Sequence, residues 1–223
     1  MDKILVLATH PDDETLGCGG YLLKKKKEGH KIYWLIITGL SETVGYSKAM
    51  CEKREKEIEA VSQAYNFDKT FNLKFDTTKL DTYPLGELVK KIGNVITEVE
   101  ASHLFLPFHS DAHSDHRITF DAGYSCTKSF RYPSLRKVYM METLSETEYA
   151  PAISGQTFIP NTFVDISDFF QEKVKVMNIY ESEIAKHPFP RSEETLEALA
   201  KYRGSTINVK YAESFVLLKD IIK

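Results

Sequence analysis

The sequence predicts an α/β fold: a mostly parallel, Rossmann-like sheet with helices on both faces and a functional site at the carboxyl ends of its strands. Two observations support this prediction. Apolar runs of strand length alternate with segments whose apolar residues recur at helical spacing. The chain has 223 residues and is 42% hydrophobic, which is enough for a full core. We therefore expect one domain over residues 1–223.

Each element is predicted from its own apolar pattern. The expected strands of the first part are KILVLA (3–8), KIYWLIIT (31–38), TFNL (70–73), HLFLP (103–107) and KVYMME (137–142). The expected helices between them cover 15–28, 48–65 and 85–99, and another begins near residue 114. Strands that alternate with helices form a parallel sheet that is covered on both faces.

The pattern becomes looser after about residue 151. The expected elements there are a β-like segment at 158–166, a helix over 169–185, the turn HPFPRS (187–192), a helix over 193–202 and a last strand ESFVLLK (213–219). We interpret residues 151–223 as an extension of the same domain.

Composition excludes several classes of partner. Charged residues make up 27% of the chain and the formal net charge is −3, whereas nucleic-acid binding usually requires a strongly basic face. No apolar run approaches membrane-spanning length, and the N-terminus leads directly into a strand instead of a signal peptide. The three cysteines form no CxxC pair and indicate reduced thiols. We expect a cytoplasmic protein with no nucleic-acid partner and no stable membrane insertion.

The segment HPDDE (10–14) places a histidine and three carboxylates where the first predicted strand ends. In an open α/β sheet, ligands bind at this edge. A dinucleotide site would need its glycines here, but GCGG (17–20) follows the carboxylates, which would repel phosphate. Close packing of a helix on the sheet explains the glycines better. The imidazole and carboxylates favour a metal site, with zinc as the first candidate; helix capping by the acidic residues is the alternative.

A second cluster, HSDAHSDHR (109–117), follows the fourth predicted strand at the same edge of the sheet. His113 and His116 are three residues apart, so one helical turn can bring both to one face. One histidine can bind metal, and the other, paired with Asp115, can be held protonated and act on the substrate. Two histidines and one carboxylate leave a zinc coordination position open for water, as catalytic sites do.

Two arginines are candidates for contacts with the substrate. Arg54 shares a helix face with Ile58 and Val61, and an arginine on an apolar stripe needs an anionic partner. That partner is either a structural carboxylate, such as Glu14 or Glu57, or the substrate. Arg191, in HPFPRS, is a second candidate for holding a substrate phosphate or carboxylate.

Together, ATHPDDETLGCGG (8–20) and the later HSDH (113–116) resemble the LmbE-like or PIG-L N-deacetylases. The resemblance implies a hydrolase that removes the N-acetyl group from an N-acetylglucosamine-type sugar or conjugate, with zinc-activated water and an aspartate general base. Ser114 stands where the family commonly has proline. The loop over 39–50 follows no family pattern, so the exact sugar and its aglycone stay open.

The resemblance also assigns roles to individual residues. It implies one zinc ion per chain, or another divalent metal, held by His10, Asp13 and His116. Asp12 would be the general base. His113 would stabilise the oxyanion or act as an acid, and Asp115 would orient and polarise His113. The partner would be a small-molecule N-acetylated sugar, and a homo-oligomer is expected because oligomers are common in the family.

Two other function classes stay open. Another metal-dependent amidohydrolase or a phosphoesterase could use this site on a non-sugar substrate. Phosphoesterases often use two metals, and His109 and Asp111 are the spare ligands nearby. A non-catalytic metal- or sugar-binding protein would not need Asp12 beside the ligand Asp13.

Overall fold

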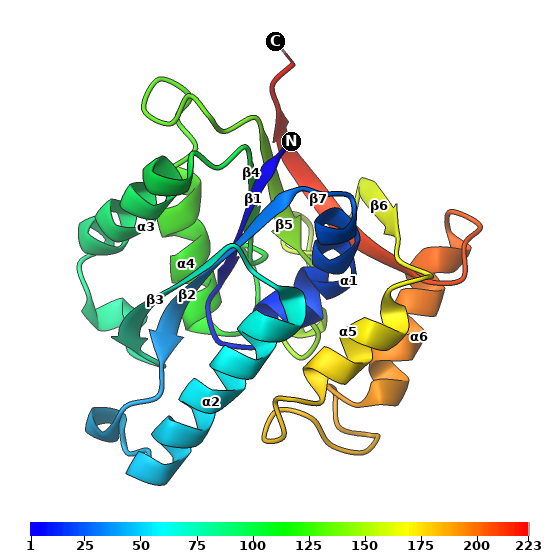
Figure 1. Cartoon of the computed structure of the whole chain (residues 1–223), viewed down its shortest axis with the longest axis horizontal. Coiled ribbons are helices and arrows are strands. Elements are labelled where there is room, and N and C mark those ends of the chain that lie inside the picture. The colour runs from blue at the N-terminus through cyan, green and yellow to red at the C-terminus, as the bar shows by residue number, and fades with distance from the viewer. Residues whose placement is uncertain (223) are drawn as a thin grey trace.

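One mixed sheet organises the molecule, which is described here from a computed structural model covering residues 1–222 (Figure 1). Its strands are β1 (Lys3–Ala8), β2 (Lys31–Gly39), β3 (Lys69–Asp76), β4 (His103–Leu106), β5 (Lys137–Met141), β6 (Thr162–Asp165) and β7 (Ala212–Asp220). Their spatial order is β3-β2-β1-β4-β5-β7-β6. Strands β1 to β5 are parallel, and β7 and β6 extend one edge in antiparallel pairing.

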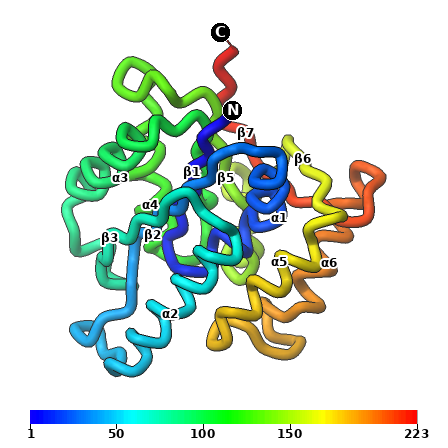
Figure 2. The backbone as a smooth tube through the Cα atoms, viewed as in Figure 1, coloured from blue at the N-terminus to red at the C-terminus, as the bar shows by residue number. Residues whose placement is uncertain are grey.

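Helices cover both faces of this sheet. They are α1 (Asp13–Lys27), α2 (Lys48–Tyr65), α3 (Leu85–Val99), α4 (Ser114–Ser125), α5 (Phe170–Met177) and α6 (Glu193–Ser205). The tube in Figure 2 shows α3 and α4 on one side of the sheet and α1, α2, α5 and α6 on the other. A hydrophobic core lies on each face of the sheet, and alternate residues of β1 contribute to each. Ile4 and Val6 belong to one core, and Leu5 and Leu7 belong to the other. The predicted α/β fold is confirmed.

The structure corrects one predicted helix. The helix expected over 169–185 ends at Met177, and residues 178–192 form a series of turns. The reason is that Tyr180 is fully buried and its hydroxyl donates to Glu14 at 2.9 Å. This contact draws the chain toward the carboxyl ends of the strands, so that the 178–192 segment lies beside the HPDDE turn. Apolar spacing alone could not reveal this, because the buried partner is 166 residues away.

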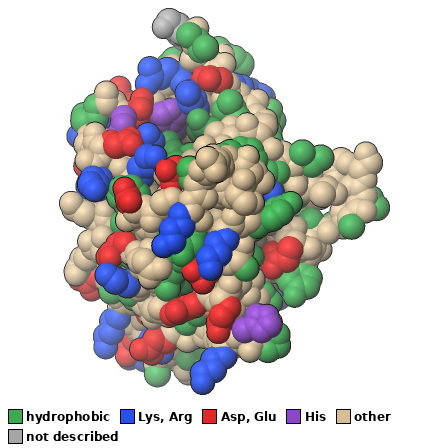
Figure 3. All heavy atoms as spheres, turned by 90° about the vertical axis from the view of Figure 1, so that its right-hand side faces the viewer, with side chains coloured by type: hydrophobic (Ala, Val, Ile, Leu, Met, Phe, Trp, Pro, Cys, Tyr) green, Lys and Arg blue, Asp and Glu red, His purple; other side chains and the backbone are tan. Residues whose placement is uncertain are grey.

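Smaller differences concern the ends of elements. Helix α1 begins at Asp13, two residues earlier than predicted, and β3 extends over Lys69–Asp76 instead of 70–73. The β-like segment at 158–166 contributes only the short strand β6. On the face shown in Figure 3, acidic and basic side chains are interspersed. No helix among residues 1–222 is both long and apolar enough to cross a membrane.

Helix α1 is broken at Cys18, and two buried charges occupy the break. Cys18 has φ −148° and ψ 21°, outside the helical region. The carboxylate of Glu213, on β7, accepts hydrogen bonds from the amides of Gly20 and Tyr21 at 2.8 and 2.7 Å. The ammonium group of Lys173, on α5, donates to the Leu16 carbonyl at 2.9 Å and to Glu213 at 2.8 Å. Residues of the 151–222 region therefore stabilise the break in α1, the helix that begins at the HPDDE turn.

The GCGG glycines allow this broken helix to approach its neighbours. A Cβ atom on Gly17 would collide with Met141, one on Gly19 with the Tyr65 hydroxyl, and one on Gly20 with Ile166. The prediction that these glycines serve close packing is therefore confirmed.

Replacing Glu213 with alanine is expected to destabilise the fold strongly. The change leaves Lys173 as a buried charge without its carboxylate and frees two buried amides. Breaking a buried ion pair in this way typically costs about 3–5 kcal/mol. Urea unfolding of both proteins measures the difference. Glu172→Ala, which breaks the exposed pair with Lys175, should change the free energy of unfolding by less than about 1 kcal/mol. Similar values for the two variants would contradict the role of Glu213.

Candidate active site

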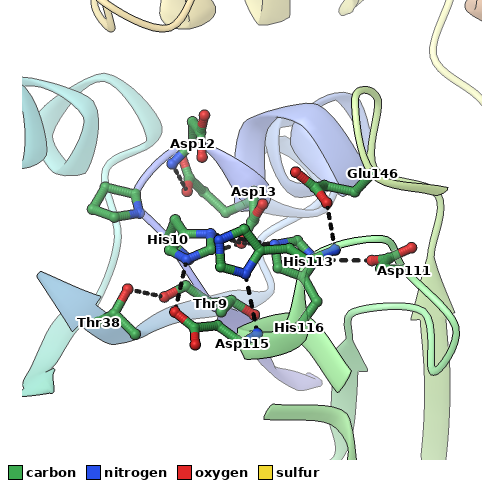
Figure 4. A network of polar contacts seen from close by, with 12 residues as sticks. Thr9, His10, Asp12, Asp13, Thr38, Asp111, His113, Asp115, His116 and Glu146 are labelled. Carbon is green, nitrogen blue, oxygen red and sulfur yellow. Dashed lines mark hydrogen bonds and ion pairs between the residues drawn. The ribbon is translucent and has the colours of Figure 1, made fainter. Parts of the chain in front are cut away.

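The two polar clusters of the sequence lie together because β1 and β4 are adjacent parallel strands. Ile4 is paired with His103 and Val6 with Phe105, so the chain leaves both strands at the same edge. The first cluster continues from β1 into α1, and the second continues from β4 into α4. Figure 4 shows their side chains converging on one point. The predicted meeting of HPDDE and HSDAHSDHR at the carboxyl ends of the strands agrees with this structure.

His10, Asp13 and His116 form the centre of the site. Nε2 of His116 lies 3.3 Å from Oδ2 of Asp13 and 3.3 Å from Nδ1 of His10. Nδ1 of His10 lies 4.0 Å from the same Asp13 oxygen. His116 and Asp13 are buried, whereas His10 is half-buried and borders a pocket. Three potential ligand atoms thus face a common point that is accessible from one side.

This arrangement fits a zinc ion. Nitrogen and oxygen ligands at about 2.0–2.2 Å from zinc in tetrahedral geometry lie about 3.3–3.6 Å from one another. Two of the three separations in the cluster have this value and the third is slightly longer. Two histidines and one carboxylate are also a known ligand set of catalytic zinc.

The ring nitrogens that face away from the centre have carboxylate partners. Nδ1 of His116 lies 2.8 Å from Asp111, whose other oxygen accepts a hydrogen bond from Thr147 at 2.7 Å. Nε2 of His10 lies 3.4 Å from Asp115. Such partners fix the ring orientation and tautomer of metal-binding histidines, leaving the opposite nitrogen free for the ion. Both histidines of the cluster therefore have the orientation that metal binding would require.

Charge is concentrated in this cluster. Burial alone would raise the pKa of Asp13, but the neighbouring His116 and His10 lower it to about 2. Burial would lower the pKa of His116, but Asp13 and Asp111 raise it well above the usual value. A proton on His116 thus occupies the position that a cation could take, and metal and proton are expected to compete there.

Asp12 lies beside this cluster in a strained backbone conformation. Its φ of 131° is unusual for a residue other than glycine, a strain of the kind found at functional sites. The residue is 5% exposed and lines the pocket. Burial, reinforced by repulsion from Asp13 and Glu183, raises the pKa of Asp12 well above its ordinary value. A carboxylate with a raised pKa is suited to accept a proton near neutral pH.

Glu14, the third acid of HPDDE, has a structural role. It is fully buried and accepts hydrogen bonds from the Thr15 hydroxyl at 2.7 Å, the Tyr180 hydroxyl at 2.9 Å and the Asp12 amide at 3.1 Å. Burial raises the pKa of Glu14 to about 7. Its contact with the Asp12 amide helps to hold the strained turn.

The structure corrects the expected pairing of Asp115 with His113. The Asp115 carboxylate accepts from the Thr78 amide at 2.6 Å and the Leu80 amide at 3.2 Å, and it lies near His10. His113 instead accepts at Nδ1 from the backbone amide of Asp115 at 3.0 Å, which caps α4. The sequence could not reveal this, because the amides of Thr78 and Leu80 belong to a distant loop.

The protonation expected for His113 is wrong as well. Burial and the neighbouring His10 lower the pKa of His113 to about 4, although Asp115 opposes this shift. A neutral ring that accepts at Nδ1 carries its proton on Nε2. His113 lines the pocket, so it can donate a hydrogen bond there without a positive charge.

The pocket over the cluster has a volume of about 190 Å³ and is also lined by both candidate arginines. Arg54 is buried: its Nε lies 3.0 Å from Glu57 and its Nη1 donates to the Pro11 carbonyl at 3.0 Å. The predicted ion pair with Glu57 is confirmed, whereas the alternative Glu14 is not its partner. Arg191 donates from Nη1 to Ser145 at 2.8 Å. Both arginines also bind Glu183.

Sequence reasoning missed three residues of this site. Asp111 was considered only as a spare ligand, but it orients His116. Glu146, which lines the pocket and accepts from the His113 amide at 2.9 Å, lies after β5 at the same sheet edge, and this position was an available signal. No sequence signal identifies Glu183, because it lies in the segment whose apolar pattern predicts a helix.

Asp115→Asn is expected to weaken metal binding by about 10–100-fold, the usual cost of losing a carboxylate behind a ligating histidine. An amide accepts more weakly than a carboxylate and no longer favours the His10 tautomer with a free Nδ1. Competition with a chelating dye measures the affinity. Asp111→Asn, which acts on His116, should have an effect of similar size. Unchanged affinity in Asp115→Asn would disprove the orienting role of Asp115.

Comparisons with known proteins place this chain in a family. The family model for PIG-L, described as GlcNAc-PI de-N-acetylase, matches residues 5–127. The diacetylchitobiose deacetylase of Thermococcus kodakarensis is 27% identical over 95% of this chain and 81% of its own length.

Solved structures with the same fold include the conserved protein TT1542 from Thermus thermophilus, with a TM-score of 0.78 and 27% identity over 100% of this chain and 97% of that one. The N,N'-diacetylchitobiose deacetylase from Pyrococcus horikoshii has a TM-score of 0.79 and 22% identity over 98% of this chain and 84% of that one.

Proposed function

Since this chain belongs to the PIG-L family, we propose that it is a metal-dependent hydrolase that removes the acetyl group from an N-acetylated amino sugar or sugar conjugate of the N-acetylglucosamine type. The observation that carries this proposal is the His10–Asp13–His116 cluster with Asp12 beside it, at the base of a pocket. The deacetylase names of the relatives support the same reaction class.

His10, Asp13 and His116 would hold the metal, and zinc is our first candidate. When bound, such an ion acts as a Lewis acid on a carbonyl oxygen and lowers the pKa of a water molecule. One ion per chain is proposed, because the alternative ligand group His10–His113–Asp115 shares His10 with the first group. The Asp115 carboxylate in that group is already bound by two backbone amides.

Asp12 would act as the general base. Its carboxylate lines the pocket beside the cluster, and its raised pKa makes it a better proton acceptor than an ordinary aspartate. After accepting a proton from the attacking water, Asp12 would be able to return it to the leaving amine. The strained backbone, braced by Glu14, would keep the carboxylate in this position.

His113 would stabilise the oxyanion. With Nδ1 occupied by the Asp115 amide, its Nε2–H is available to the pocket. A neutral donor of this kind stabilises developing negative charge and typically contributes a few kcal/mol. Asp115 would contribute through His10 and through the amide that caps α4, as a positioning residue.

Acetate release from N,N'-diacetylchitobiose and N-acetylglucosamine, measured with zinc-loaded protein, tests the proposed function. Release that requires the metal is the expected result, and chelator treatment followed by zinc addition should remove and restore it. Release of phosphate from phosphate esters, without acetate from any N-acetyl sugar, would favour a phosphoesterase. Sugar binding without turnover would favour a binding protein. Either result would overturn the proposal.

A further inference from the structure

Glu183 stands between the two arginines of the pocket. One carboxylate oxygen pairs with Nη2 of Arg54, and the other lies 3.1 Å from Nη2 of Arg191. The backbone carbonyl of Glu183 also accepts from Nε of Arg191 at 2.8 Å. Glu183, Arg54 and Arg191 all line the pocket that borders the His10–Asp13–His116 cluster. The two guanidinium groups that could bind a substrate anion are thus bound to one carboxylate of the protein.

Arg54 has further partners within the protein. Nη1 of Arg54 donates to the Pro11 carbonyl at 3.0 Å, and its Nη2 also donates to Ser182 at 3.0 Å. Glu57 lies 3.0 Å from Nε, so Arg54 contacts two carboxylates. A substrate anion would have to displace Glu183 from this pair of cations, and it would gain little from the exchange.

The charge of the whole pocket also disfavours an anionic substrate. Four carboxylates line it (those of Asp12, Asp13, Glu146 and Glu183), against the two guanidinium groups. Glu146 accepts a hydrogen bond from the His113 amide and has no lysine or arginine partner among the residues that the structure describes. A divalent ion at the cluster would balance the difference in charge. The loaded pocket is then close to neutral, and a phosphate or carboxylate on the substrate would add uncompensated negative charge.

We propose that Glu183 is a specificity-determining residue that makes this pocket select neutral N-acetylated amino sugars over phosphorylated or carboxylated ones. The inference rests on the proposed deacetylase function and narrows its substrate class. It also reverses the expectation that Arg191 holds a substrate phosphate or carboxylate. A specificity of this kind arises by excluding the wrong ligand, because the cations stay available for hydrogen bonds to hydroxyl groups but offer no net positive charge.

The wild-type enzyme tests the inference first. Acetate release is compared for N-acetylglucosamine against its 6-phosphate, and for the methyl glycoside against the 1-phosphate. Each pair differs mainly in charge at one position. The kcat/KM of the neutral member is expected to be higher by about tenfold or more in both pairs. Equal or faster turnover of either phosphate would overturn the inference and leave the deacetylase function intact. No acetate from any of the four or from N,N'-diacetylchitobiose would overturn the proposed function itself.

Glu183→Gln then tests the residue. The substitution keeps the shape of the side chain but frees positive charge on Arg191 and Arg54. The ratio of kcat/KM for phosphate over neutral substrate should rise by about tenfold or more, and added salt should reduce this gain because it screens charge. Adding Arg191→Gln to Glu183→Gln should cancel most of the gain.

Glu181→Gln is the matched control. Glu181 lies two residues away, pairs with Lys53 at 2.7 Å on the surface and does not line the pocket. Its substitution should leave the ratio unchanged. The inference is overturned if Glu183→Gln leaves the ratio at the wild-type value, or if Glu181→Gln changes it equally. Because the readout is a ratio within one protein, a general loss of activity or folding does not imitate it.

Discussion

Replacing His116 with alanine is expected to abolish binding of the proposed metal and with it essentially all of the proposed deacetylase activity. The variant loses one of three proposed ligands. It also leaves the fully buried carboxylate of Asp111 without its partner, Nδ1 of His116. The loss of affinity should exceed the 10–100-fold or so that follows from losing a carboxylate behind a ligand. Metal analysis of the purified protein measures the occupancy.

His10→Ala and Asp13→Ala should also lose the metal, because each removes one atom of the same cluster. His187→Ala is the control, since His187 is an exposed histidine outside the cluster. Full occupancy in any one of the three variants would remove that residue from the ligand set. Loss of metal in His187→Ala would indicate that occupancy reports general damage instead.

Asp12→Asn is expected to keep the metal and the fold but to lose about 10²–10⁴-fold in kcat, the usual effect of removing a general base. The amide has nearly the same shape as the carboxylate but cannot accept the proton of the attacking water. Asp121→Asn, on the exposed side of α4, makes the same change away from the pocket and should have no effect. A metal-replete Asp12→Asn protein with nearly normal turnover would disprove the assignment.

The dependence of kcat/KM on pH is a second test of Asp12 as the general base. Asp12 accepts a proton only when it is ionised, so kcat/KM should fall as the pH falls through its pKa. Because that pKa is raised, the acid limb should lie above about pH 3.9, where an ordinary aspartate titrates. The residual activity of Asp12→Asn should lack this limb.

The mostly parallel sheet and the convergence of the two motifs at its carboxyl edge could be predicted from the sequence, because both follow from local patterns. Alternating apolar runs identify β1 and β4, and parallel strands present their carboxyl ends at one edge. The spacing of His113 and His116 on a helical turn added a second local signal. These rules bring the two motifs together without any knowledge of packing, whereas the choice of His10, Asp13 and His116 as the ligands came from the family resemblance.

Contacts that depend on distant segments could not be predicted. Asp115 lies between His113 and His116 in the HSDH motif, and this closeness in sequence suggested that it pairs with His113. In the fold, the amides of Thr78 and Leu80 bind its carboxylate and direct it to His10. The position of Glu183 in the pocket could not be predicted either, because α5 ends early where Tyr180 is buried against Glu14. Periodicity describes one segment at a time and cannot register such contacts.

The pocket is built from two stretches of chain with separate tasks. The proposed ligands, base and oxyanion donor all lie within residues 5–127, the part that matches the family model. The residues that complete its wall lie outside that part, and they are Leu144, Ser145, Glu146, Glu183 and Arg191. Arg54 joins the two stretches through Pro11 and Glu183.

This division means that substrate preference can diverge while the reaction stays the same. Within the 178–192 segment, substitutions at Glu183 and Arg191 alter the wall without replacing a proposed ligand, while Tyr180 keeps its contact with Glu14. Grafting that segment from a relative of different preference, together with its partner at position 145, is therefore a direct route to redesigned deacetylases. Duplicated genes could follow the same route to new sugars.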